Sequence, residues 1–264
     1  MKKPNTQTQA AHVTLVGAGP GDPELLTLKA VKAIVNATVL LVDDLVSDAI
    51  VSYASPSARI IYVGKRGGCQ STPQAFIEKL MLQEAYAGEN VVRLKGGDPF
   101  IFGRGGEEVE HLQAQGVAVT VINGITSGLA GVTSLGVPLT HRDHAHGVLF
   151  ITGHAKQEAT EPVDWTALSH TAAQAKLTLV IYMGMRGVAM LQASLLQGLA
   201  PQTPVCVIQH VSLPTQRHVV CTLDALHDNV LRHHMASPSV IVVGDVLQGL
   251  LHVEQNSQRF IAAA

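Results

Sequence analysis

The chain has 264 residues, of which 47% are hydrophobic and 14% are charged, and its formal net charge is −2 at pH 7. This length and composition allow a full buried core in one large or two smaller domains, which excludes a disordered or fibrous protein. Because no broad basic surface is available, we expect no nucleic-acid partner, and an anionic ligand must be met by local Arg and Lys side chains.

Cysteine usage and the N-terminal segment indicate where the protein acts. Cys69, Cys206 and Cys221 form no C-x-x-C pair, so we expect neither a disulfide framework nor a zinc ribbon, but small core or loop residues. Residues 1–11 are polar and lack the apolar run of a signal peptide, so we interpret them as a flexible tail. No later stretch without charge or glycine is long enough to span a membrane. We therefore expect a cytoplasmic protein with no membrane partner.

Short β-branched runs alternate with helical patterns in the first half of the chain. The predicted strands cover residues 13–16, 39–42, 60–63, 91–94 and 117–122. Apolar residues at helical spacing predict a helix over residues 24–35, and Thr72-Pro73 predicts an N-cap with proline at the first position of a helix over 74–86. Such alternation predicts a parallel sheet with both faces covered.

The second half has a different strand pattern. After Gly136-Val137-Pro138 the chain is polar and rich in histidine, and strands then follow over residues 148–152, 177–182, 204–208, 218–221 and 240–243. The close spacing of strands between residues 204 and 221 predicts a mixed sheet. The fold class is therefore two α/β domains, with boundaries at 12–136 and 137–264.

Two loops share the pattern of a strand end, glycines and Asp-Pro, namely residues 17–23 and 96–99. Glycine is needed where a Cβ would block a close approach or where φ is positive, so these loops predict a small-molecule site. A dinucleotide fingerprint is one interpretation, because Asp43 or Asp44 follows the next strand. Against it, Asp22 occupies the position of the third glycine and Pro20 removes a backbone donor. The chain has no P-loop sequence.

A longer set of motifs resembles the uroporphyrinogen-III C-methyltransferase family of the tetrapyrrole methylase superfamily. The motifs lie at residues 16–30, 43–47, 64–68, 93–108, 124–127 and 138–143, and the resemblance extends from His12 to about Leu250. The glycine loops alone fit any member of the superfamily, including the precorrin methylases. The segments at 43–47, 64–66 and 140–143 narrow the resemblance to the uroporphyrinogen enzymes.

This resemblance implies a fold, a reaction and a site. Such enzymes transfer methyl groups from S-adenosylmethionine to C2 and C7 of uroporphyrinogen III, giving precorrin-2 for sirohaem or cobalamin pathways and S-adenosylhomocysteine as the second product. They act as homodimers without a metal, with the active site in the cleft between their two α/β domains. Carried over by position, the implied cofactor contacts are Pro20, Gly96, Gly97, Asp98, Ile101, Thr126, Ser127, Met183 and Val211.

The resemblance also implies catalytic residues. Asp43 matches the family's proton acceptor and Lys65 its proton donor, and a carboxylate has a role because the pyrrole must lose a proton after methylation. The alternative for Asp43 is an acid that caps a helix at a strand–helix junction. Positioning of the reacting groups is expected to contribute much of the rate.

The substrate carries eight carboxylates, which require local cations. Arg66, Arg104 and Arg142 lie in loops beside the motifs and are expected to pair with them. Arg93 and Lys95 are weaker candidates because they belong to a strand end. The acids at positions 107 and 108 suit the first turn of a helix, which favours a structural role.

Some observations oppose or complicate this interpretation. His141, His144 and His146 lack the spacing of a helical zinc site, so we expect no metal. Asn123 replaces a usual proline, and Val211 replaces a small residue near the expected adenine pocket. Three alternatives stay open: a precorrin methylase for another ring position, a non-catalytic tetrapyrrole- or S-adenosyl-binding protein, and an NAD-dependent oxidoreductase.

Overall fold

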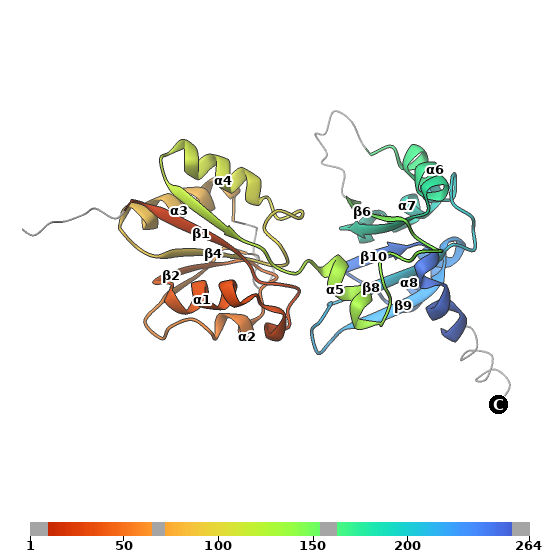
Figure 1. The fold of residues 1–264 in the computed structure, drawn as a ribbon, viewed down its shortest axis with the longest axis horizontal. Helices are drawn as coiled ribbons and strands as arrows, with labels where there is room; N and C mark the ends of the chain where they lie inside the picture. Colours follow the sequence, from red (N-terminus) through yellow and green to blue (C-terminus); the bar gives the residue numbers. More distant parts are fainter. Residues whose placement is uncertain (1–9, 65–71, 154–162, 255–264) are drawn as a thin grey trace, which may run out of the picture. The chain divides into compact units, whose positions relative to one another are not determined.

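The computed structural model describes residues 10–64, 72–153 and 163–254, and the chain divides into two compact units, Met1–Thr126 and Ser127–Ala264 (Figure 1). The predicted boundary lies after residue 136, whereas the observed division lies after Thr126. The residues between the two boundaries include helix α5 (Ser127–Ser134), which contacts strands of the second unit. Within the described ranges, no helix is both long enough and apolar enough to cross a bilayer.

The first unit contains a five-stranded sheet with the order β3-β2-β4-β1-β5, in which every neighbouring pair is parallel. Its strands are β1 (His12–Gly17), β2 (Val39–Val42), β3 (Arg59–Tyr62), β4 (Val91–Lys95) and β5 (Ala118–Ile122). The predicted parallel sheet is confirmed, and each predicted strand differs from the observed one by at most one residue at either end.

Helices cover both faces of this sheet (Figure 1). On one face lie α1 (Leu28–Asn36) and α2 (Asp48–Val51), and on the other α3 (Gln74–Tyr86) and α4 (Gly105–Ala114). Alternate strand residues supply the two cores, because successive side chains of a strand point to opposite faces. Leu40 of β2 packs with Ile34 of α1, whereas Leu41 packs with Met81 of α3.

The first helix differs from the prediction. A short 3₁₀ helix, η1 (Pro23–Leu25), comes first, and α1 begins only at Leu28, where the Thr27 hydroxyl accepts a hydrogen bond from the Ala30 N–H at 3.1 Å. The predicted helix over residues 24–35 was therefore wrong at its start, because a capping threonine interrupts it. Helix α3 has the predicted bounds, but Pro73 occupies the N-cap position and not the first helical position.

The second unit contains a mixed sheet with the order β6-β7-β10-β8-β9, as predicted. Strands β6 and β7 are parallel, and the pairs β7–β10, β10–β8 and β8–β9 are antiparallel. The strands are β6 (Gly147–Thr152), β7 (Leu177–Tyr182), β8 (Pro204–Gln209), β9 (Arg217–Thr222) and β10 (Ser239–Val243).

Helices also pack on both faces of the second sheet. The larger core lies against α6 (Trp165–Ala175), α7 (Val188–Leu195) and α8 (Leu226–Arg232), and short 3₁₀ helices occupy Met185–Gly187, Leu223–Ala225 and Asp245–Leu247. On the opposite face, α5 approaches closely because it carries glycines: a Cβ on Gly128 would lie 2.3 Å from the Tyr182 hydroxyl. That hydroxyl accepts a hydrogen bond from the Gly128 N–H at 2.9 Å.

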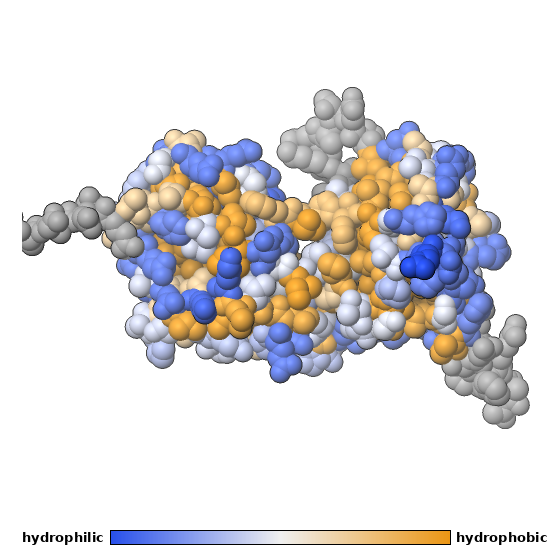
Figure 2. Space-filling view, viewed as in Figure 1, coloured by the Kyte–Doolittle hydropathy of each residue, from blue (hydrophilic) through white to orange (hydrophobic). Residues whose placement is uncertain are grey.

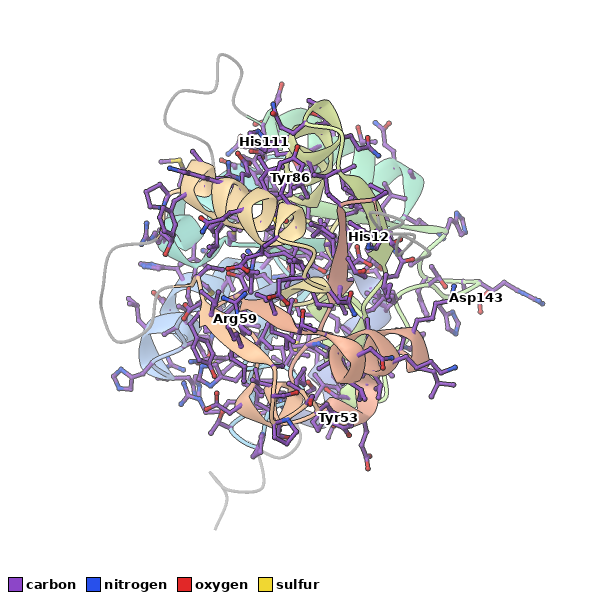
Figure 3. All side chains as sticks on the ribbon, turned by 90° about the vertical axis from the view of Figure 1, so that its left-hand side faces the viewer. His12, Tyr53, Arg59, Tyr86, His111 and Asp143 are labelled. Atoms are coloured by element: carbon purple, nitrogen blue, oxygen red, sulfur yellow. The ribbon has the colours of Figure 1, made fainter. Side chains whose placement is uncertain are left out.

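Polar and apolar residues are interspersed over the viewed surface (Figure 2). Arg59 belongs to the edge strand β3 (Figure 3). Its guanidinium pairs with the carboxylates of Glu84 and Glu89. This ion pair lies at the opposite side of the sheet from β5, because β3 and β5 are its two edges.

Candidate active site

The glycine motifs meet at the carboxyl ends of the strands of the first sheet. We call this region the glycine edge and define it as residues 17–23, 43–47, 96–104 and 123–126. The N–H of Gly97 donates to the Gly19 carbonyl at 2.7 Å, and the N–H of Gly19 donates to the Gly97 carbonyl at 3.1 Å. The two loops predicted to approach a ligand are thus bonded to each other, at the edge where ligands of open α/β sheets bind.

The glycines of this edge are required for different reasons. A Cβ on Gly17 would lie 2.4 Å from the Gly124 nitrogen, and one on Gly96 would lie 2.7 Å from the Leu45 Cβ, so packing within the chain requires both. Gly97 has φ +68°, and a Cβ there would approach only Thr126, at 3.8 Å. At Gly97, unlike at Gly17 and Gly96, the missing side chain therefore leaves open space.

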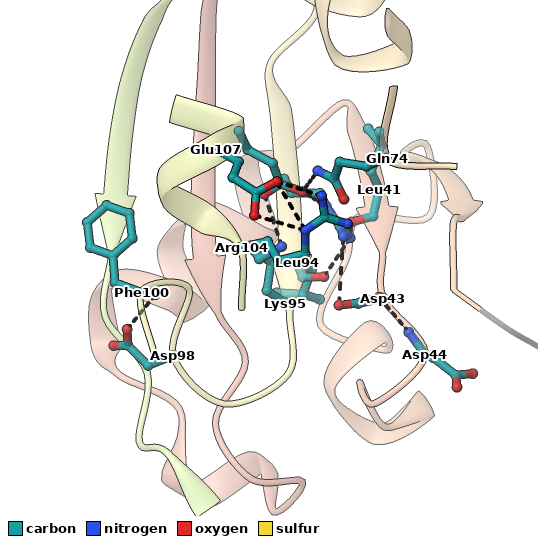
Figure 4. Close-up of polar contacts among 12 residues, drawn as sticks. Leu41, Asp43, Asp44, Gln74, Leu94, Lys95, Asp98, Phe100, Arg104 and Glu107 are labelled. Atoms are coloured by element: carbon teal, nitrogen blue, oxygen red, sulfur yellow. Dashed lines mark hydrogen bonds and ion pairs between the residues drawn. The ribbon is translucent and has the colours of Figure 1, made fainter. Parts of the chain in front are cut away.

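Asp98 holds the glycine edge together. One carboxylate oxygen accepts from the Phe100 N–H at 2.8 Å (Figure 4). The other accepts from the Gly124 N–H and from the Asn123 side-chain amide, both at 3.1 Å. Asn123, which replaces the usual proline, thus supplies one of these donors. Because both oxygens are engaged and the residue is buried, Asp98 shapes the loop.

Asp43 follows β2 and is half-exposed. The next helix, α2, begins at Asp48 with Ser47 as its N-cap, so Asp43 does not cap it and that alternative is wrong. The Asp43 carboxylate accepts a hydrogen bond from the Asp44 N–H at 3.1 Å, and its other oxygen lies 3.7 Å from the Arg93 guanidinium.

A buried charge cluster lies behind Asp43, and its members were predicted to have only minor roles. Arg93 and Lys95 are 2% and 3% exposed at the side chain, and both contact Glu108 of α4, which is fully buried. The Arg93 Nε lies 3.2 Å from one Glu108 oxygen and the Lys95 Nζ lies 3.0 Å from the other. Burial, followed by the Arg93 charge, lowers the pKa of Lys95, while Glu108 opposes that shift. The available signal was two cations two residues apart in an otherwise apolar strand.

The other predicted polar residues have varied environments. The exposed Arg104 guanidinium makes a bidentate contact with Glu107, at 3.1 and 3.2 Å from its Nε, which raises the pKa of Arg104. A substrate carboxylate must compete with that partner. Arg142 is exposed in a turn closed by a bridge between His141 and Ala145. The predicted residues Lys65 and Arg66 lie outside the described residues.

Two predicted cofactor residues of the second unit lie where strands β7 and β8 end. Met183 is 49% exposed and has φ +55°, and Val211 lies between His210 and Ser212, which both have positive φ. Positive φ in such residues costs energy and is concentrated at functional sites. The Val211 side chain is buried, and its Cγ2 would lie 3.3 Å from a Cβ on Gly131 of α5, so this side chain packs close to α5.

The comparison with protein families agrees with this arrangement. Residues 12–227 match the model of the tetrapyrrole (corrin/porphyrin) methylases, which is most of the chain. The chain belongs to this family.

Individual methylases are similar over nearly their whole length. The uroporphyrinogen-III C-methyltransferase of Pseudomonas aeruginosa is 49% identical, covering 92% of this chain and 96% of that relative. The structure of uroporphyrin-III C-methyl transferase from Thermus thermophilus, complexed with S-adenyl homocysteine, has a TM-score of 0.76 and 39% identity, covering 90% and 99% of the two chains. A cobalt precorrin-4 methyltransferase structure has a TM-score of 0.80 at 26% identity, covering 90% and 96%. The predicted resemblance is confirmed.

The first glycine loop of this tetrapyrrole methylase does not have the geometry of a dinucleotide site. Asp22 accepts from the Glu24 N–H at 2.9 Å and caps η1, so no α-helix begins directly at this loop to bind a pyrophosphate. Among the described residues, no group of three or more His, Cys, Asp or Glu side chains could hold a metal ion.

Proposed function

We propose that this chain methylates uroporphyrinogen III at C2 and C7, using S-adenosylmethionine, to give precorrin-2 by way of precorrin-1. The observation that carries the proposal is 49% identity to a uroporphyrinogen-III C-methyltransferase across 96% of that relative. Precorrin-2 would serve sirohaem or cobalamin-type synthesis. The family resemblance further supports a cytoplasmic homodimer that needs no metal.

The glycine edge fits an S-adenosyl group. When bound, this group supplies an electrophilic methyl on a sulfonium, which needs alignment and no phosphate site. Gly97 offers the space that a Cβ would fill, and Pro20, Gly96 and Thr126 lie on the same edge. Asp98 keeps the loop in this shape, and Ile101 and Met183 offer exposed apolar surface to the adenine and thioether. Ser127 and the Val211 backbone complete the proposed set.

Charged residues carry out the proton transfer and bind the carboxylates of the substrate. A pyrrole carbon forms the new bond to the methyl while the sulfur–methyl bond breaks, and the macrocycle then loses a proton. The Asp43 carboxylate accepts this proton. The resemblance also implies Lys65 as a proton donor; since the methylation releases one proton overall, any proton that Lys65 gives to the macrocycle must also leave it through an acceptor. Arg66, Arg104 and Arg142 pair with substrate carboxylates, and the exposed Phe100 and Phe102 offer apolar surface for the ring.

Binding calorimetry tests this proposal against an oxidoreductase. We expect S-adenosylhomocysteine to bind with micromolar or tighter affinity, equivalent to about −8 kcal/mol or better, and NAD to bind much more weakly. Equal or stronger binding of NAD would contradict the proposed function. A precorrin methylase would bind S-adenosylhomocysteine equally well, so only the substrate and the methylated ring positions separate this rival.

A further inference from the structure

The buried charge cluster, defined as Arg93, Lys95 and Glu108, connects helix α4 to Asp43 (Figure 4). Glu108 contacts both cations, and Arg93 bridges from Glu108 to the half-exposed Asp43 carboxylate. Charges of alternating sign thus lead from the buried Glu108 carboxylate, through the Arg93 guanidinium, to the Asp43 carboxylate at the glycine edge.

Strand register places these groups on one face of the sheet. Leu41 of β2 pairs with Arg93 of β4, and the Asp43 N–H donates to the Leu94 carbonyl at 3.0 Å, so the pairing continues beyond β2. Residues 41 and 43 share a face, as do residues 93 and 95, because side chains alternate along a strand. Leu41 belongs to the core beneath α3, which is the face that α4 also covers. Asp43 therefore extends the row that contains the two cations.

The Arg93 guanidinium is fixed on several sides. Its Nε contacts Glu108, and its Nη1 lies 3.4 Å from the Leu41 carbonyl and 3.3 Å from the Leu94 carbonyl. The same Glu108 oxygen accepts from the Gln74 side-chain amide at 3.1 Å, which restrains the acid from α3 as well. A planar guanidinium held at these points keeps its remaining nitrogen in one place.

The charges of the cluster do not cancel without Asp43. Arg93 and Lys95 carry two positive charges when both are protonated, and Glu108 carries one negative charge. An unbalanced buried charge is costly, so the cluster favours an anion at its mouth, and Asp43 occupies that position. Within residues 10–64, 72–153 and 163–254, the charged groups that these ion pairs and the sequence bring beside Asp43 are Arg93 and Lys95 from β4, Glu108 from α4, and the adjacent Asp44.

We propose that Arg93 is a positioning residue that aims the Asp43 carboxylate, and that Glu108 sets the orientation of Arg93. This inference rests on the proposed function, because it assigns Asp43 the role of proton acceptor. It makes the buried ion pairs part of the reaction and not only of the fold.

The test compares Arg93→Gln with Arg59→Gln. The control removes another guanidinium of the same sheet that pairs with two carboxylates, at the edge strand β3. We expect Arg93→Gln to lower the single-turnover methylation rate by about 10-fold or more, a part of the ~10²-fold effect of a general base. We also expect the loss to appear in kcat and not in KM or in the affinity for S-adenosylhomocysteine, because Arg93 acts on the Asp43 carboxylate and not on either ligand. Arg59→Gln should change thermal stability only.

Two further variants keep the test decisive if Arg93→Gln does not fold. Arg93→Lys keeps the charge but loses the planar fork, and Glu108→Gln keeps Arg93 but removes its anchor. Both should lower the rate several-fold at unchanged affinity for S-adenosylhomocysteine. Folding is checked by thermal unfolding, and the rates are measured well below the unfolding temperature.

The outcomes separate this inference from the function on which it rests. If the unmodified chain does not methylate uroporphyrinogen III, the proposed function fails. If it does, and any folded variant at position 93 or 108 has the normal rate, the positioning role is overturned. A change in stability alone, of the kind expected for Arg59→Gln, would likewise assign Arg93 to the fold.

Discussion

Asp43 is the residue on which the proposed chemistry depends most. Its carboxylate caps no helix and faces a buried guanidinium, so the structure gives it no separate stabilising role as an N-cap. We predict that Asp43→Asn lowers the methylation rate by ~10²-fold or more and leaves the affinity for S-adenosylhomocysteine nearly unchanged. Single-turnover methylation and calorimetry measure the two effects.

The matched control is Asp44→Asn, because Asp44 is the adjacent acid and its side chain is exposed. It should keep a rate close to that of the unmodified chain. A normal rate for Asp43→Asn, or an equal loss in both variants, would remove Asp43 from the proposed reaction.

The reactivity of the Cys206 and Cys221 thiols is set mainly by their burial. Burial raises the pKa of each thiol to about 12, with smaller contributions from Cys221 and Asp224 respectively. We predict that neither thiol reacts with iodoacetamide in the folded chain at pH 8, and that both react after unfolding. Peptide mass analysis of the alkylated sites checks this, and rapid labelling of either site in the folded chain would contradict it.

The same shift makes stability depend on pH in a defined direction. In the folded state both thiols keep their protons above pH 9, whereas the unfolded thiols release theirs near that pH. The contribution to stability is therefore fully present below about pH 9 and is lost as the pH rises towards about 12. Replacing both cysteines by alanine should reduce this alkaline loss.

At the scale of elements, the glycine edge is where the loops after β1, β4 and β5 meet. We predict that Gly97→Ala lowers the affinity for S-adenosylhomocysteine by about 10-fold or more, because the added methyl enters the open space beside the loop. The variant also carries the strain of an L-residue at φ +68°. Calorimetry gives the affinity and thermal unfolding gives the stability.

Gly116→Ala provides the control for strain. Gly116 has φ +74°, and a Cβ added there would have no other atom within 4 Å, so this variant has a similar conformational cost away from the glycine edge. Both variants should lose about 1 kcal/mol of stability, and only Gly97→Ala should lose affinity. Equal affinities would exclude Gly97 from the ligand site.

The strands could be predicted because they are short apolar runs between turn residues. The start of α1 could not, because the apolar spacing continues through Leu25 and Leu26 while Thr27 caps the helix after them. The glycine loops also marked the candidate site. The contacts of Glu108 with Arg93 and Lys95 were missed, since they depend on how α4 lies on β4, which no local pattern specifies.

At the scale of the whole molecule, the proposed site residues are divided between the two units. Asp43 and the glycine edge belong to the first unit, and Met183 and Val211 follow strands β7 and β8 of the second. The parallel sheet of the first unit gathers the carboxyl ends of all its strands at one side, whereas in the second sheet only β6 and β7 are parallel neighbours and the other neighbouring pairs are antiparallel. The fold is shared with a cobalt precorrin-4 methyltransferase, so fold alone does not define the substrate.

The positions of the transferred methyl groups test the central proposal most directly. The chain is incubated with uroporphyrinogen III and S-adenosylmethionine carrying a carbon-labelled methyl group, and the product is analysed by mass spectrometry and carbon NMR. The account predicts two labelled methyl groups, at C2 and C7, and far less label with the Asp43→Asn chain on the time scale of the normal reaction. An unmethylated product, or a label at another ring position, would contradict it.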